Sequence, residues 1–112
     1  MEFNFKQNQQ ITIERVKEII LITIKDAFQE ILGETSTMVV WHYLLLNTGL
    51  RIEDILDRPE IFISFIRNLF KDGAKIIEKK IKEKLCYRFK INPENIENID
   101  LIDIIKQIIT KY

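Results

Sequence analysis

Residues 58–80 read RPEIFISFIRNLFKDGAKIIEKK, and this stretch decides the fold. Its apolar side chains recur every three to four residues, which predicts two amphipathic helices on either side of Gly73. Pro59 stands where the first turn of a helix tolerates proline, and Asp57 and Glu60 are spaced as a capping pair around it. The glycine between the helices permits a tight turn. The stretch therefore predicts two consecutive helices, each with one apolar face.

The same periodicity predicts helices on the N-terminal side of this pair. A long helix over residues 12–32, ended by Gly33, carries a wide apolar stripe, so we expect it at the centre of the fold, packed on more than one side. A second helix, capped by Thr35 or Ser36 and running to about residue 47, has little polar face. We expect that second helix to be largely buried.

A short helix over residues 51–56 and a final helix after a break near residues 98–99 complete the prediction. The predicted fold class is all-α, a compact orthogonal or up-down bundle of five principal helices plus one short helix. A length of 112 residues fits one domain, residues 1–112. We expect residues 1–10 to be a flexible arm, with a short strand as the alternative.

Charge is balanced over the whole chain but not along it. Seventeen basic and seventeen acidic residues cancel, so no overall field steers the molecule to nucleic acid or to an anionic membrane. Residues 71–90, however, hold eight basic side chains against three acidic ones. This basic face is either a solvated lysine surface, which we prefer, or a site for phosphates. Its candidate contact residues are Lys75, Lys79, Lys80, Lys82, Lys84 and Arg88.

The side chains that catalysis most often uses are scarce. His42 is the single histidine, and its neighbours one helical turn away are apolar, which favours a core histidine bonded to a backbone group. Cys86 is the single cysteine, interpreted as a small, partly buried thiol. Asp26 and Glu30 are interpreted as part of a solvated acidic face. We therefore expect no enzyme, no catalytic residue, no metal, no cofactor and no small-molecule substrate.

Location follows from the same inventory. A single cysteine excludes an internal disulfide and indicates a reducing compartment. The N-terminus lacks the pattern of a signal peptide, and no apolar run is long enough to span a bilayer. We expect a cytoplasmic protein without membrane contact.

Several short motifs resemble a family of small archaeal helical modules described as signalling output domains. The resemblance covers about residues 28–89, and the family pattern has a second glycine where this chain has Lys71. It implies a regulatory or interaction role and no catalytic residues. The motifs are Gly33-Glu34-Thr35-Ser36-Thr37, Trp41-His42-Tyr43-Leu44, Glu53-Asp54-Ile55, Pro59-Glu60-x-Phe62 and Leu69-Phe70-x-x-Gly73-Ala74-Lys75-x-x-Glu78.

The helices carry more apolar surface than one small core requires, which predicts a protein interface. The predicted function is a non-catalytic helical interaction or regulatory module that associates with itself as a homodimer or higher oligomer, or with another protein. The alternative is a nucleic-acid-binding regulator that uses the basic face. An apolar stripe in the final helix is expected at or near the interface, unless it closes the chain's own core. Its members are Leu101, Ile104, Ile105, Ile108 and Tyr112.

Overall fold

The computed structural model of the protein describes residues 12–112. They form five α-helices and three short 3-10 turns, and no strand occurs among them. The all-α fold class is thereby confirmed, while the expected arm or strand over residues 1–10 lies outside the described residues. The α-helices are α2 (Ile13–Leu32), α3 (Glu34–Thr48), α4 (Pro59–Phe70), α5 (Ala74–Phe89) and α6 (Leu101–Lys111). The 3-10 turns are η1 (Ile52–Asp57), η2 (Lys71–Gly73) and η3 (Ile96–Asn98).

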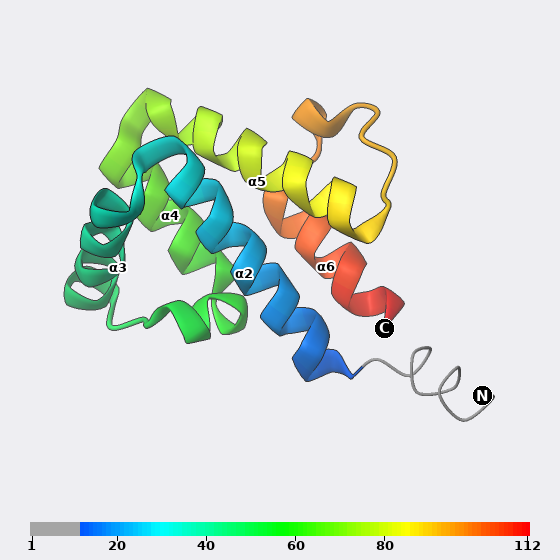
Figure 1. Ribbon diagram of the computed structural model, residues 1–112, viewed down its shortest axis with the longest axis horizontal. Helices are drawn as coiled ribbons and strands as arrows, with labels where there is room; N and C mark the ends of the chain where they lie inside the picture. The colour runs from blue at the N-terminus through cyan, green and yellow to red at the C-terminus, as the bar shows by residue number, and fades with distance from the viewer. Residues whose placement is uncertain (1–11) are drawn as a thin grey trace.

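Helix α2 crosses the middle of the molecule, and α3, α5, α6 and η1 all pack against it (Figure 1). It begins where the Thr12 side chain accepts a hydrogen bond from the backbone N–H of Arg15, a regular N-cap. Val16, Ile20 and Ile24 on its inner side are completely buried. The wide stripe predicted a central helix, and the packing confirms it.

One residue, Gly33, ends α2 and starts α3. Its backbone N–H donates to the carbonyl of Gln29, and its φ of +84° with ψ of 167° lies in a region that favours glycine. The Thr37 hydroxyl donates to the Gly33 carbonyl at 2.7 Å, which helps to fix the first turn of α3. Helix α3 therefore begins at Glu34, and neither predicted cap, Thr35 or Ser36, caps it.

An aromatic cluster holds α2, α3 and α4 together. Phe28 on α2 is fully buried, and its ring lies edge-on to that of Trp41 on α3, with the ring centres 4.7 Å apart. Phe62 and Phe70 on α4 approach the same ring at 6.2 and 6.3 Å. Such packed rings stabilise a core beyond the apolar area that they bury, so this cluster fixes where α3 lies.

Helix α4 starts at Pro59, as the sequence predicted, but without the predicted capping pair. Arg58 is the N-cap residue and makes no side-chain cap bond. A capping hydrogen bond from a side chain is found instead at the start of η1, where the Asp54 carboxylate accepts from the Arg51 backbone N–H at 3.3 Å. The predicted short helix is this 3-10 helix of six residues.

The turn between α4 and α5 contains a strained lysine. Lys71 has φ +53° and ψ −124°, a combination that side chains with a Cβ rarely adopt. Gly73, which the sequence marked as the turn residue, has an ordinary φ of −66°. Lys71, and not Gly73, is thus the residue of this turn whose backbone conformation favours glycine.

Candidate interaction surface

The apolar stripe of α6 lies inside the chain's own core. Leu101, Ile104, Ile105 and Ile108 are all at least 97% buried, because α6 packs against both α2 and α5. Of the predicted interface residues only Tyr112 is exposed, and its ring lies beside that of Phe89. The four buried members of the stripe therefore close the chain's own core, which was the alternative to an interface, and only Tyr112 offers free surface.

The basic face of α5 is largely occupied by contacts within the chain. Lys80 and Lys84 reach Glu30 on α2 at 3.2 and 2.6 Å. Arg88 reaches Asp26 at 2.6 Å and donates to the hydroxyl of Thr23 at 2.9 Å. The two acidic residues interpreted as solvated are therefore the partners of this face, and three of its six predicted contact residues join α5 to α2.

The electrostatics of Glu30 agree with this pairing. The hydrogen bond from Lys84, followed by that from Lys80, holds the pKa of the Glu30 carboxyl below its usual range. The same charges stand near the surface, so water and salt screen them. The pairs join the two helices at the surface of the molecule.

Lys82 is buried and serves the chain's own backbone. Its ammonium donates to the carbonyls of Ile96 and Ile99, both at 2.9 Å. Arg67 and Glu78 form a two-pronged ion pair nearby, at 3.1 and 3.0 Å, and the hydrogen bond to Glu78 raises the pKa of the Arg67 guanidinium. Lys82 thus holds the connector that leads from α5 to α6, and the Arg67–Glu78 pair joins α4 to α5.

Two of the predicted contact residues, Lys75 and Lys79, remain exposed and pair with no carboxylate among residues 12–112. They line a shallow cleft of about 350 Å³ together with Glu97 and Asp100. Acidic and basic side chains thus alternate around this cleft, and an uninterrupted positive groove is not formed there.

The sequence analysis predicted the burial of Cys86 correctly, but not the exposure of His42. His42 is exposed on α3, so the prediction of a core histidine is wrong. Cys86 is buried, as expected, and burial raises the pKa of its thiol. A neutral, enclosed thiol is a poor nucleophile.

The largest departure from the sequence prediction is α3, which was expected to be buried. Only Thr37, Val40 and Leu44 are buried on it. Met38 is 64% exposed and Leu46 66% exposed, with Val39 at 47% and Tyr43 at 46%. These four side chains and His42 form what we term the α3 outer face.

The position of α3 explains its exposure. It lies at the edge of the molecule, and among the described residues its main contacts are with α2 and α4 (Figure 1). A helix with apolar residues all round can bury only the side that meets its neighbours. No charged residue occurs between positions 35 and 50, so the remaining side meets water with apolar groups.

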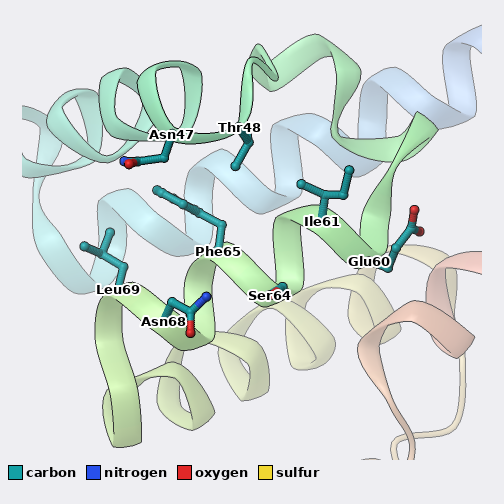
Figure 2. A pocket seen from close by; sticks show the side chains of 8 residues that line it. All are labelled: Asn47, Thr48, Glu60, Ile61, Ser64, Phe65, Asn68 and Leu69. Carbon is teal, nitrogen blue, oxygen red and sulfur yellow. The ribbon is translucent and has the colours of Figure 1, made fainter.

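A groove of about 480 Å³ lies where α3 ends beside α4 (Figure 2). Asn47 and Thr48 belong to α3, while the ring of Phe65 and the half-exposed Leu69 come from α4. The remaining lining residues are Glu60, Ile61, Ser64 and Asn68. The groove combines an apolar floor with amide and hydroxyl groups at its rim.

Neither a metal centre nor a membrane span is present in the part of the chain that the structure describes. No three His, Cys, Asp or Glu side chains among residues 12–112 are placed to hold a metal ion. None of the helices in that part combines the length and apolar character needed to cross a bilayer.

Comparison with known proteins gives no relative. The chain matches no family model, no curated protein and no solved structure.

Proposed function

We propose that this chain is a non-catalytic helical interaction module whose contact surface is the α3 outer face. One observation supports this above all others. A run of sixteen residues without charge, at positions 35–50, covers all but the first residue of a surface helix in a chain whose residues are 30% charged. Contiguous exposed apolar side chains at one site are typical of a protein-binding surface.

The composition of the face fits such a role. Met38 offers an adaptable side chain, Tyr43 a rigid ring with a polar end, and Leu46 a branched apolar group. Aromatic residues and methionine are enriched in protein interfaces, and charged residues are depleted at their centres. Removing these side chains from water provides a favourable free energy for association.

The neighbouring groove enlarges this surface on the α4 side. Leu69 and Phe65 supply apolar contact, while Asn47 and Asn68 supply amide donors and acceptors at the rim. Polar groups at the edge of an apolar contact orient a partner and exclude misaligned ones. The regulatory role implied by the resemblance to the archaeal output modules is part of this proposal.

The nucleic-acid alternative has less support. Lys80, Lys84 and Arg88 bind carboxylates of α2, and Lys82 binds backbone carbonyls. A phosphate would have to displace those partners. If the alternative holds, Lys75→Glu with Lys79→Glu abolishes a salt-sensitive affinity for duplex DNA or RNA. We expect no such affinity to be measurable.

The proposal is tested by a photo-crosslinking amino acid placed at position 46 in the cells that make this chain. Position 107 on α6 is the matched control, because Gln107 is exposed on a helix whose apolar stripe is buried. We expect discrete adducts from position 46 that disappear when Met38→Glu is added, and none from position 107. Adducts at neither position, or equally at both, would refute the proposed contact surface.

A further inference from the structure

We infer that the occupant of the α3 outer face is a second copy of this chain, paired with α3 antiparallel to α3. The inference rests on the proposed function, because it names the partner of that same surface. Two features of the described residues carry it. They are the order of residue types along the face and the charges at the two ends of α3.

The face carries apolar side chains toward both of its ends and its two polar residues in the middle. Met38 and Val39 lie toward its N-terminal end, Leu46 toward its C-terminal end, and His42 and Tyr43 between them. A two-fold axis between positions 42 and 43 sets Val39 against Leu46 of the second copy, and Met38 against Asn47. The same axis brings His42 beside Tyr43 of the second copy, so that the two polar groups of the face can hydrogen-bond to each other.

The charges at the ends favour the antiparallel direction. Glu34 is the first residue of α3, and Arg51 is the first charged residue after it, and both are exposed. Antiparallel pairing places Glu34 near Arg51 of the second copy at each end, whereas parallel pairing places like charges together. The dipoles of the two helices are also opposed in this arrangement, which is the favourable direction.

The acidic residues that follow Arg51 belong to the next element of the chain. Glu53 and Asp54 belong to η1, which packs against α2 and α4. The Asp54 carboxylate already accepts the backbone N–H of Arg51. Arg51 is therefore the charged side chain that directly follows the end of α3.

The test uses two variants, each of which reverses the charge at one end of α3. Glu34→Lys makes both ends of α3 positive, and Arg51→Glu makes both ends negative, so each variant repels itself. In an equimolar mixture the two variants satisfy both ion pairs of an antiparallel heterodimer. Sedimentation velocity gives the mass of each sample at matched concentration, and far-ultraviolet circular dichroism confirms that each variant keeps its helices.

We expect the unmodified chain to dimerise and each single variant to dissociate at least about tenfold more readily, since two ion pairs become repulsive in each. The mixture should recover the dimer, and Leu46→Glu should give a folded monomer. An unmodified chain that stays monomeric, or single variants that dimerise as it does, would overturn the inference. So would two dissociated variants that fail to recover a dimer when mixed.

Failure here is distinguishable from failure of the proposed function. A monomeric chain that still gives a discrete adduct from position 46 with another protein overturns the second copy but leaves the contact surface in place. A monomeric chain with no adduct overturns both.

Discussion

Helices α3 and α6 are both rich in apolar residues, yet they differ in how many of these residues they bury. Helix α6 gathers Leu101, Ile104, Ile105 and Ile108 on one side and buries all four. Helix α3 carries apolar residues all round and buries only one side, leaving Met38 and Leu46 in water. A one-sided stripe belongs to the chain's own core, and an all-round apolar helix at an edge has a surplus that a partner can cover.

Helix α5 shows the converse case. It is the most highly charged helix, and yet Glu78 and Lys82 on it are buried. Each buried charge is paired, Glu78 with Arg67 and Lys82 with two backbone carbonyls. The many charges on α5 therefore did not mean that all its charged side chains are exposed. In the same way, the many apolar residues of α3 did not mean that the helix is buried.

The largest effect should come from placing one glutamate on each of the two contrasted helices. Ile105→Glu buries an unpaired charge and should lower the free energy of unfolding by about 3–5 kcal/mol, enough to unfold a marginal domain. Leu46→Glu lies in water and should change it by less than about 0.5 kcal/mol.

Urea unfolding at low protein concentration measures both variants without a contribution from association. Equal losses of stability in the two variants would mean that α3 is as much a core helix as α6, and the contrast would fail.

A second variant tests how α6 is held in its buried position. Lys82→Ala leaves the carbonyls of Ile96 and Ile99, just before α6, without their donor. It should cost about 1–3 kcal/mol, while Lys79→Ala, an exposed lysine one helical turn away, should cost less than about 0.5 kcal/mol. Thermal or urea unfolding of the pair gives the difference. Equal effects would show that the connector is held without Lys82.

A smaller, stabilising effect is expected at the turn between α4 and α5. Lys71→Gly relieves a backbone conformation that disfavours a Cβ and should raise the free energy of unfolding by about 1 kcal/mol. Lys90→Gly is the matched control, because Lys90 has φ +56° and ψ 45°, the milder left-handed region. Its gain should stay below about 0.5 kcal/mol. A stability loss at Lys71→Gly would contradict the strain assigned to this turn.

The smallest effect concerns the ion pairs between the basic residues of α5 and the acidic residues of α2. The pKa of Glu30 is lowered by the hydrogen bonds from Lys84 and Lys80, so its carboxylate stabilises the folded state above the unfolded-state pKa. That contribution is lost as the pH falls below about 4. Glu30→Gln should thus be less stable than the unmodified chain near neutral pH, and the two should converge in acid. A difference that stays constant across this range would exclude the pairing.

Much of the fold was predictable because local periodicity and local packing agree. The apolar spacing of α4 and α5 and the cap at Thr12 are set by neighbours in sequence. The strain at Lys71 was not predictable from periodicity, because the glycine of that turn, Gly73, takes an ordinary helical conformation instead.

The candidate site was misplaced for a physical reason. The interface was expected on α6 because the helices before it carry enough apolar residues to fill a core of this size. Helix α3, however, lies at the edge and gives only one side to that core. A signal was present in the sequence, since α3 has no charged residue after Glu34 and α6 keeps Asp103, Lys106 and Lys111 on its outer side. Apolar content alone could not separate a helix at the centre from one at the rim.

The most direct test is a concentration series of amide nuclear magnetic resonance spectra, from about 10 μM to about 1 mM, where a weak dimer assembles. The α3 outer face paired with a second copy predicts shifts confined to residues 34–51 and to the groove residues Ser64, Asn68 and Leu69. Shifts centred on α6 or on the basic face of α5 would contradict this account, as would spectra that do not change with concentration.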